Sequence, residues 1–387
     1  MKARAAIFDN GPRPRLAEID LLAPGANDVL VRLVATGICH TDTKAARPGG
    51  PVPHPVVLGH EGAGIVEKVG DRVSKVTPGD HVVLTFSSCG ACASCREAEP
   101  AFCHEVFELN FACRSRRPAS AGESRVHIGF FGQSSFATHA LVQERNAVVV
   151  DKAAPLELLG PLGCGFQTGA GAVLNDFRLR AGDSIAVFGA GGVGMAAIMA
   201  ARLSGAGAII AVDRQPDRLE LAAELGATLC LNAETDEVVP TIMAATRVGV
   251  NFALDTTGAL GPMRQAIDVL APRGECGFVT GPWDGAELGV PVRQLLAGRR
   301  LRGIHQGSSN PDMFIPRLVG LHLQGRFPID RLARFYDFAE IDTALDDMEA
   351  GRTIKPILRF AGGRWAGRHG PRAQAAGRSG SATRSVP

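Results

Sequence analysis

The glycine-rich run GAGGVG, residues 189–194, lies between two apolar segments of different character. Residues 184–188 before it form a short run typical of a buried strand, and residues 192–203 after it have the length and composition of a helix. The run matches G-x-G-x-x-G, in which glycines let the backbone approach a pyrophosphate and the helix amino terminus donates N–H groups to it. This setting predicts a doubly wound parallel sheet that binds a dinucleotide through Gly189, Gly191, Gly192, Val193 and Gly194.

Further strand-like and helix-like segments alternate after this motif, which is the rhythm of a βαβ fold. Residues 208–212, 250–254 and 276–279 are expected strands, and residues 216–225 are an expected helix. Asp213 ends the second strand, where a carboxylate can accept hydrogen bonds from the hydroxyls of an adenosine ribose. The uncharged run 184–201 has the length of a membrane span, but glycines interrupt it, so no membrane helix is expected.

The amino-terminal part of the chain has a different pattern of short, β-branched runs. Residues 29–35, 65–69, 79–84 and 147–150 are expected strands, separated by turn pairs such as Pro78-Gly79. Many short strands with Gly and Pro between them predict an antiparallel, barrel-like domain. Its loops, rather than its strands, are expected to carry the polar chemistry.

Four cysteines follow one another at close spacing inside this part: Cys89, Cys92, Cys95 and Cys103, in the pattern C-x2-C-x2-C-x7-C. Four thiolates that leave no position open suit a closed, tetrahedral structural zinc site. An iron–sulfur cluster uses the same ligands, but the bacterial run closes after three residues and continues with proline. Here the last gap is seven residues and His104 follows, so the spacing favours zinc.

A second set of potential metal ligands is scattered along the chain. Cys39 lies in GICHTD, His60 and Glu61 lie in GHEGAG, and Cys164 stands between two glycines that would let the backbone approach a metal closely. Two thiolates and one neutral imidazole suit Zn²⁺, and three protein ligands leave a fourth position open, as in a catalytic site. Each residue taken singly is more often a packed or surface side chain, so the metal hypothesis depends on their combination.

Residues 37–41, 59–64 and 163–168 resemble the zinc-dependent medium-chain alcohol dehydrogenases, and residues 130–138, FFGQSSFAT, resemble the bacterial aryl-alcohol (benzyl-alcohol) dehydrogenases. The similarity extends from about residue 25 to Phe360. It implies a GroES-like, mostly antiparallel β catalytic domain and a Rossmann domain with the doubly wound parallel sheet. The implied bounds are 1–165 and 306–360 for the catalytic zinc domain, including a structural zinc lobe at 89–103, and 166–305 for the NAD-binding domain. Residues 361–387 form a basic Gly/Ala/Arg/Ser tail that is expected to be disordered.

The resemblance also implies roles for residues around the second ligand set. Thr41 matches the hydroxyl that takes the substrate proton and passes it to the cofactor ribose, and Asp42 matches the carboxylate that orients the imidazole ligand. Glu61 resembles a carboxylate behind the metal that can act as a transient ligand. Some members end their proton relay in a histidine that aligns with Lys44, so the last step here is left to Lys44, water or another group.

The expected cofactor contacts outside the glycine run come from basic and hydroxyl side chains. His40 and Lys355 match basic positions near the cofactor pyrophosphate, and Arg218 matches a basic contact to the NAD ribose. Thr168 completes this expected set. For these side chains the alternative is an ordinary solvated loop position.

Phe130 and Phe131 align with substrate-pocket positions of the resembled family, and the aligned positions Gly50 and Thr85 are small. Two rings that face small residues would form a flat slot for an aromatic substrate. The alternative is that both phenylalanines belong to the core.

The predicted protein is therefore an NAD-dependent, zinc-containing dehydrogenase with two zinc ions per subunit, which reversibly oxidises primary, aromatic or allylic alcohols to aldehydes. Alternatives are an aliphatic or terpenoid alcohol dehydrogenase, a thiol-dependent formaldehyde dehydrogenase and, in a different class, a non-catalytic zinc and nucleotide binding protein. The net charge is only +2, and the basic tail contributes five arginines, so the rest of the chain has a small negative charge. Neither nucleic acid nor membrane is therefore an expected partner. The amino terminus lacks an apolar signal-peptide region, which predicts a cytoplasmic protein, and a homo-oligomer (dimer or tetramer) is expected.

Overall fold

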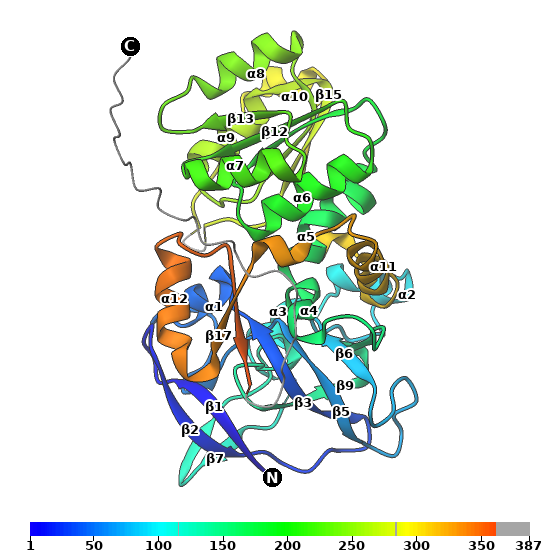
Figure 1. Cartoon of the computed structure of the whole chain (residues 1–387), viewed down its shortest axis with the longest axis vertical. Coiled ribbons are helices and arrows are strands. Elements are labelled where there is room, and N and C mark those ends of the chain that lie inside the picture. Colours follow the sequence, from blue (N-terminus) through cyan, green and yellow to red (C-terminus); the bar gives the residue numbers. More distant parts are fainter. Residues whose placement is uncertain (115, 283–284, 361–387) are drawn as a thin grey trace, which may run out of the picture.

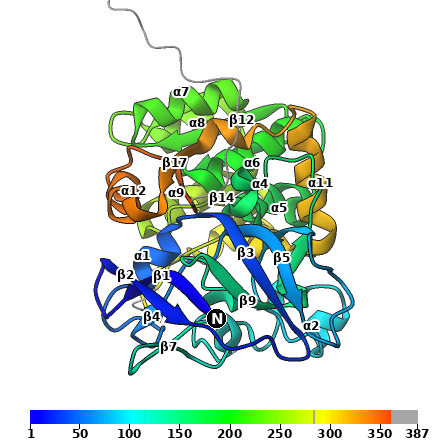
Figure 2. The ribbon, with the colours of Figure 1, turned by 60° about the horizontal axis from the view of Figure 1, so that its bottom comes forward.

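The structure is a computed structural model that describes residues 1–114, 116–282 and 285–360. A parallel sheet with its helices occupies the upper half of Figure 1, and antiparallel sheets occupy the lower half. The chain enters the upper half once and then returns to the lower half. After the parallel sheet come the helices α11 (Pro311–Leu323) and α12 (Ile341–Glu349), which flank the lower half on opposite sides (Figures 1 and 2). The tail predicted at 361–387 lies outside the described residues.

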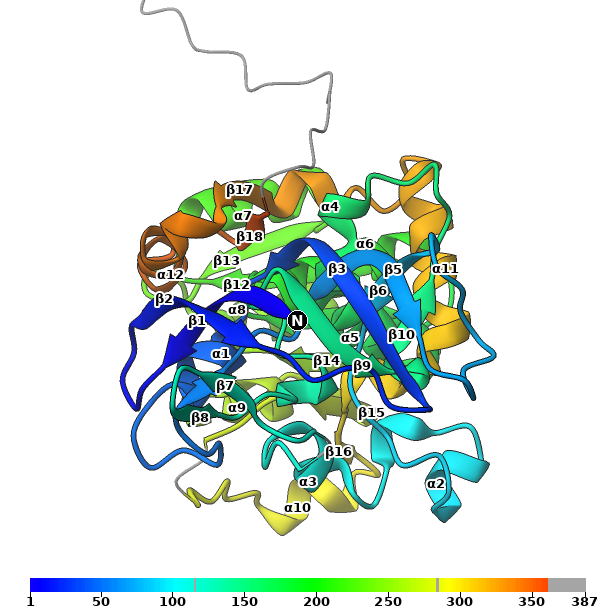
Figure 3. The same cartoon turned by 90° about the horizontal axis from the view of Figure 1, so that it is seen from below.

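Two sheets build the lower half, and they face the viewer in Figure 3. The first has the order β4-β1-β2-β7-β8, with strands β1 (Lys2–Phe8), β2 (Pro14–Asp20), β4 (Val56–Val57), β7 (Ala119–Ala121) and β8 (Ser124–Val126). The second has the order β10-β6-β5-β3-β18-β17, and β9 also pairs with β3; its strands are β3 (Asp28–Gly37), β5 (Gly62–Val69), β6 (His81–Leu84), β9 (His139–Gln143), β10 (Ala147–Val149), β17 (Ala333–Asp337) and β18 (Lys355–Arg359). All pairs in these sheets are antiparallel except β17 with β18.

Short helical segments connect these strands. The α-helices are α1 (His40–Ala45), α2 (Ala93–Arg96), α3 (Val106–Asn110) and α4 (Leu156–Leu159). The 3-10 segments are η1 (Pro100–Phe102), η2 (Phe130–Gly132), η3 (Glu144–Asn146), η4 (Gly160–Gly163), η7 (Ile329–Leu332) and η8 (Phe338–Glu340). Strand β3 is the longest of the second sheet and is rich in β-branched residues, and its end delivers Cys39 to the start of α1.

The upper half is a parallel sheet with the strand order β13-β12-β11-β14-β15-β16. Its strands are β11 (Ser184–Phe188), β12 (Ala208–Asp213), β13 (Leu229–Asn232), β14 (Val250–Asp255), β15 (Leu270–Phe278) and β16 (Arg300–Gly303). Its helices are α6 (Gly192–Leu203), α7 (Pro216–Leu225), α8 (Val238–Thr246), α9 (Leu260–Asp268) and α10 (Val292–Leu296). The strand order reverses between β11 and β14, and ligands of such sheets bind at this switch point.

Helix α5 (Gly165–Gly171) and the π-helical segment η5 (Ala172–Phe177) connect the two halves, and η6 (Gln306–Ser308) lies on the returning chain. One apolar core joins both halves, because buried residues of β3, α5, α6 and α11 belong to the same cluster. The other two clusters lie under the antiparallel sheets and on the second face of the parallel sheet. The boundary between the halves is therefore packed with side chains, with α5 at its centre.

The predicted fold class is confirmed in both halves. The segments expected at 184–188, 192–203 and 216–225 match β11, α6 and α7 residue for residue. The expected strand at 276–279 is wrong at its start, since β15 begins at Leu270, and the one at 79–84 begins only at His81, because Gly79 has a positive φ of 90° and forms a turn. No helix within the described ranges is long and apolar enough to span a membrane.

Candidate active site

The second set of predicted metal ligands converges in the structure. The ligand atoms of Cys39, His60, Glu61 and Cys164 all lie within 4.8 Å of one another, and this cluster is mostly buried. Cys39 precedes α1, His60 and Glu61 precede β5, and Cys164 lies between η4 and α5. Three distant loops thus bring two thiols and one imidazole to one point, which is the donor set of a catalytic zinc site.

Asp42 orients this cluster from a fully buried position. Its Oδ1 accepts hydrogen bonds from His60 Nδ1 at 2.9 Å and from the Gly59 amide at 3.0 Å, and its Oδ2 accepts one from the Cys39 amide at 2.9 Å. The opposite ring nitrogen, His60 Nε2, is buried and has no hydrogen-bond partner within the described ranges. A metal-bound histidine typically has this arrangement: one ring nitrogen donates a hydrogen bond to a carboxylate, and the other has no hydrogen-bond partner in the protein and can bind the metal.

The two thiols of the cluster interact directly, and this interaction raises the pKa of Cys164. A hydrogen bond from Cys164 lowers the pKa of the Cys39 thiol well below its usual range, against the effect of burial. The thiolate form is the one that binds metal. The donor set, its burial and the unpaired imidazole nitrogen therefore fit Zn²⁺.

Glu61 and Lys355 form a buried ion pair behind the cluster. Lys355 Nζ lies 2.9 Å from both carboxylate oxygens of Glu61 and 3.0 Å from the Ile38 carbonyl oxygen. Burial acts to lower the pKa of Lys355, but the Glu61 carboxylate outweighs it and holds the pKa above its usual value. The lysine side chain also reaches the start of α6, since its Cε would lie 3.5 Å from a Cβ built on Gly192. Lys355 thus lies between the metal ligands and the glycine turn.

The other predicted residues of this region lie on α1. Thr41 Oγ1 is 3.7 Å from Cys39 Sγ, His40 is exposed at the first position of the helix, and Lys44 lies in its last turn. Thr41 and Lys44 are three residues apart, so their side chains lie on the same face of the helix.

A group of aromatic rings packs against the imidazole. The Phe131 ring stacks on His60 with a centroid distance of 4.5 Å, and the Phe130 ring meets it edge-on at 5.4 Å. Phe111, which the sequence did not single out, contacts Phe131 at 5.1 Å and Phe130 at 6.0 Å. Phe130 is fully buried and Phe131 is 5% exposed, so in this structure both rings support His60.

The four closely spaced cysteines also converge, with sulfur atoms within 4.8 Å of one another. Backbone amides point at the sulfurs: Cys103 Sγ accepts from the Cys89 amide at 3.2 Å, and Cys89 Sγ accepts from the Cys92 amide at 3.3 Å. Hydrogen bonds from the amides of His104 and Cys95 lower the pKa of Cys92 to about 6. This lobe fits a structural zinc ion held by four thiolates, as predicted.

The glycine turn has no room for side chains on its inner side. A Cβ on Gly189, whose φ is 92°, would lie 2.6 Å from Thr256 Oγ1, and one on Gly194 would lie 1.8 Å from the Gly189 carbonyl oxygen. A Cβ on Gly191, in contrast, would meet nothing within 4 Å among the described residues, so this side is open to a ligand. Val193 faces α5, where its carbonyl oxygen would lie 1.9 Å from a Cβ on Gly169.

Asp213 braces this turn from the end of β12. Its Oδ2 accepts a hydrogen bond from the Ala190 amide at 2.7 Å, its Oδ1 accepts one from the Gln215 amide at 2.9 Å, and Arg218 Nη1 lies 3.9 Å from Oδ2. Thr168, on α5, donates a hydrogen bond to the Cys164 carbonyl oxygen at 2.9 Å.

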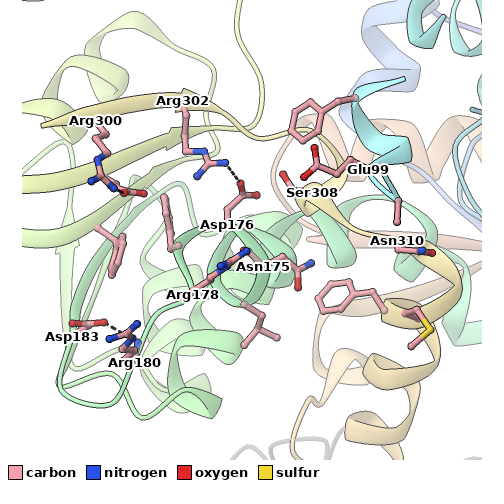
Figure 4. Close-up of a pocket in the computed structure, with 18 of the residues that line it drawn as sticks. Glu99, Asn175, Asp176, Arg178, Arg180, Asp183, Arg300, Arg302, Ser308 and Asn310 are labelled. Atoms are coloured by element: carbon pink, nitrogen blue, oxygen red, sulfur yellow. Dashed lines mark hydrogen bonds and ion pairs between the residues drawn. The ribbon is translucent and has the colours of Figure 1, made fainter. Parts of the chain in front are cut away.

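A cavity of about 1230 Å³ lies outside the cluster of Cys39, His60 and Cys164 and outside the glycine turn. It is lined by the end of the zinc lobe, by η5 and by β16, and none of the predicted site residues borders it. Figure 4 shows its arginines beside carboxylates: Arg302 pairs with Asp176 at 2.7 Å and Arg300 with Glu275 at 2.5 Å. These two arginines are therefore already paired with carboxylates of the protein.

Comparison with known proteins agrees with this geometry. Residues 25–152 match the model of the alcohol dehydrogenase GroES-like domain, and residues 192–319 match that of the zinc-binding dehydrogenase family. The chain belongs to the zinc-binding alcohol dehydrogenases. This chain is 42% identical over 367 residues to a geraniol dehydrogenase of Castellaniella defragrans, and the match covers 93% of this chain and 98% of that one.

Two solved structures resemble the alcohol dehydrogenase over most of its length. One is an alcohol dehydrogenase zinc-binding domain protein from Burkholderia ambifaria, with 49% identity, a TM-score of 0.91 and coverage of 93% of this chain and 99% of that chain. The other is benzyl alcohol dehydrogenase from Acinetobacter calcoaceticus, with 43% identity, a TM-score of 0.89 and coverage of 93% and 100%. The predicted family and its dehydrogenase activity are confirmed, and the structural and catalytic zinc sites agree with it.

Proposed function

We propose that this alcohol dehydrogenase reversibly oxidises primary alcohols whose carbinol carbon is attached to an aromatic ring or a double bond, with NAD as the hydride acceptor. The observation that carries the proposal is the three-ligand set of Cys39, His60 and Cys164, with aromatic rings packed on the imidazole. The names of two similar proteins, a benzyl alcohol dehydrogenase and a geraniol dehydrogenase, support this substrate class. The carbinol carbon is benzylic in the first alcohol and allylic in the second.

Zinc bound by these ligands would act as a Lewis acid that lowers the pKa of the alcohol hydroxyl. Thr41, beside Cys39, is proposed to accept the proton from that hydroxyl and pass it towards the cofactor ribose. Lys44, on the same face of α1, is proposed to receive it. Asp42 keeps the imidazole of His60 in the tautomer that leaves Nε2 for the metal.

Phe130 and Phe131 are proposed to shape the substrate site from behind the imidazole. Phe131 is the more exposed of the two, so it is the better candidate for direct contact with a substrate ring. Such a contact adds about 0.5–1.5 kcal/mol beyond simple burial. The Thr85 hydroxyl, expected on the opposite side of the slot, instead donates to the Gly163 carbonyl oxygen at 2.9 Å.

The NAD preference is proposed from Asp213 and its neighbours. A carboxylate at the end of β12 would face the additional phosphate of NADP, and like charges about 4 Å apart near a surface repel by about 1–4 kcal/mol. Two arginines could counter this, but Arg218 lies beside Asp213 itself and Arg214 lies 4.0 Å from Glu234. NAD is therefore expected to be favoured at least about tenfold.

The remaining proposals concern the arrangement of the chain. We propose a catalytic domain of residues 1–165 and 306–360 and a cofactor domain of residues 166–305. The place of α5 and η6 at the junction of the two halves supports these bounds. The active protein is proposed to be a cytoplasmic dimer or tetramer.

The decisive experiment is a set of initial rates with benzyl alcohol, geraniol, ethanol, a secondary alcohol, and formaldehyde with added thiol, each with NAD and with NADP. Benzyl alcohol and geraniol are expected to give the highest kcat/KM with NAD. Equal kcat/KM values for these two alcohols would indicate that the site selects a carbinol carbon attached to an unsaturated carbon, whether aromatic or allylic. A strong preference for ethanol, for formaldehyde with added thiol, or for NADP would refute the proposed substrate or cofactor.

A further inference from the structure

Gln167 is the fifth residue of the motif GCGFQT. It is fully buried on α5, three residues after the metal ligand Cys164. Its Nε2 lies 2.5 Å from the Gly163 carbonyl oxygen and 3.0 Å from Thr85 Oγ1, and its Oε1 accepts a hydrogen bond from Ser309 Oγ at 2.9 Å. Both donor hydrogens and the acceptor of the amide are therefore used. A fully satisfied buried amide holds its neighbours in one arrangement.

On one side, these contacts lead to the metal ligands. Thr85 Oγ1 donates to the Gly163 carbonyl oxygen at 2.9 Å, in the peptide group that precedes Cys164. The Thr85 carbonyl oxygen lies 3.4 Å from Gln133 Nε2, which also donates to the His60 carbonyl oxygen at 2.9 Å. Buried hydrogen bonds thus connect the backbone beside Cys164 with the backbone of His60.

On the other side, the contacts reach the segment by which the chain returns from the parallel sheet. This crossover, residues 304–309, runs from the end of β16 to the start of α11 and contains η6. It touches α5 through backbone atoms: a Cβ on Gly171 would lie 2.3 Å from the Gly307 carbonyl oxygen, and a Cβ on Gly307 would lie 2.3 Å from the Gln167 carbonyl oxygen. There is no room for a methyl group between the two segments, so their backbones are in direct contact.

The crossover is held at other points as well. Asn175 Nδ2, on η5, donates to the Gly307 carbonyl oxygen at 3.0 Å, and Asn175 and Ser308 are both seen beside the cavity in Figure 4. His305 Nδ1 lies 2.9 Å from the Ala101 carbonyl oxygen in the structural zinc lobe. The crossover is thus fastened to the zinc lobe, to η5 and, through Gln167, to the metal ligands.

The backbone conformation of Cys164 is not helical. Its φ of −142° and ψ of −93° lie outside the helical region, although it stands between two helical segments. The Cys164 carbonyl oxygen accepts the first hydrogen bond of α5, from the Thr168 amide at 3.0 Å, but the residue itself does not have helical dihedral angles. The contacts of Gln167 with Gly163 and Ser309 add a constraint from the first turn of α5.

We propose that Gln167 is a positioning residue that fixes the Cys164 thiolate relative to His60 and ties this geometry to the crossover between the two halves. The proposal rests on the assignment of zinc to Cys39, His60 and Cys164. It extends to the Gln167 partner Ser309, which would carry the connection to the crossover.

Gln167→Met tests the proposal with little disturbance. Without the amide, Thr85 Oγ1 still donates to the Gly163 carbonyl oxygen. The single hydrogen of the Ser309 hydroxyl can then turn to the Gln306 carbonyl oxygen, 2.8 Å away, so the remaining side chains keep a partner. Ser309→Ala removes only the connection to the crossover. Thr228→Val is the matched control, because its hydroxyl makes two hydrogen bonds with Ile209 in the parallel-sheet half, away from the metal ligands.

The readouts are zinc release to a chelator and the thiolate absorption of the cobalt-substituted holoenzyme, with the melting temperature as a measure of general damage. Gln167→Met is expected to weaken zinc binding at the catalytic site by about 10–100-fold and to shift the cobalt spectrum. Ser309→Ala should change both in the same direction by less. Thr228→Val should lower only the melting temperature.

The proposal is overturned if Gln167→Met lowers the melting temperature but keeps the zinc release rate and cobalt spectrum of the wild type. Should Gln167→Met fail to fold, Ser309→Ala decides, because a wild-type spectrum and release rate in that variant also refute the connection. A wild-type protein that holds only the structural zinc would refute the zinc assignment itself. That result is distinct from a wild type with two zinc ions and unaffected variants.

Discussion

Replacing Asp42 by asparagine should disable the catalytic metal site while the protein stays folded. All three partners of the carboxylate are donors: His60 Nδ1 and the Gly59 amide at Oδ1, and the Cys39 amide at Oδ2. An asparagine has one acceptor oxygen, so its NH2 group must point at a donor in either orientation. If the NH2 group faces Cys39, that amide loses its partner. If it faces His60, the imidazole must take the tautomer that carries a proton on Nε2, which then cannot bind the metal.

The size of the effect follows from these contacts. Losing one buried hydrogen bond to a charged group costs about 1.5–3 kcal/mol. Since about 1.4 kcal/mol corresponds to a factor of ten, zinc affinity at this site should fall by about 10–100-fold, in agreement with the usual effect of removing such a partner of a metal-bound histidine. The structural zinc should be unaffected, because its cysteines lie in a separate cluster.

The assay is competition for zinc with a chromophoric chelator, combined with kcat at saturating zinc. Asp20→Asn is the control, since it makes the same chemical change at an exposed position of β2. It should leave zinc affinity and kcat unchanged. If Asp42→Asn also holds its catalytic zinc with wild-type affinity, the orienting role of Asp42 and the tautomer argument are both wrong.

Four other predictions concern the metal, the substrate, the cofactor and the effect of pH. The wild type should hold two zinc ions per subunit by metal analysis; Cys164→Ala should lose one of them and all turnover but stay folded, whereas Cys92→Ala should mainly impair folding. Visible iron–sulfur absorption would contradict the assignment of the four-cysteine site. Phe131→Leu should reduce kcat/KM for benzyl alcohol about two- to tenfold more than for ethanol, and equal losses would rule out direct ring contact. Asp213→Ser should weaken NAD use and raise NADP use in paired kinetic assays; a wild type that already uses both cofactors equally would refute the role of Asp213. Burial raises the pKa of Glu157, so its neutral form stabilises the fold below the unfolded-state pKa and this contribution is lost as the pH rises through the folded-state pKa. Glu157→Gln should therefore raise the melting temperature at pH 8 and leave it unchanged near pH 4, and calorimetry that shows the opposite order would contradict this.

The local parts of the site could be predicted from the sequence. The glycine turn depends on short-range backbone geometry, because Gly189 needs its positive φ and Gly194 must approach the Gly189 carbonyl oxygen, and such requirements leave a recognisable spacing. The four-cysteine lobe likewise gathers its ligands within one short loop. Helix α6 follows the turn with the bounds that its apolar run predicts.

The long-range contacts of the site were decided by the tertiary structure. Lys355 meets Glu61, 294 positions away in sequence, and Ser309 meets Gln167, 142 positions away. Nothing in the local pattern of either residue specifies such a partner, because lysine, serine and glutamine occur equally well at solvated positions. Phe130 and Phe131 illustrate the same limit, since their residue type indicated aromatic chemistry near the metal but only the packing of Phe111 and His60 around them determined how little of each ring is exposed. Sequence alone determined which chemical groups this alcohol dehydrogenase carries and the turns that present them, because those depend on neighbouring residues. The tertiary structure decided which of these groups are buried against one another, because burial and pairing depend on how distant segments pack.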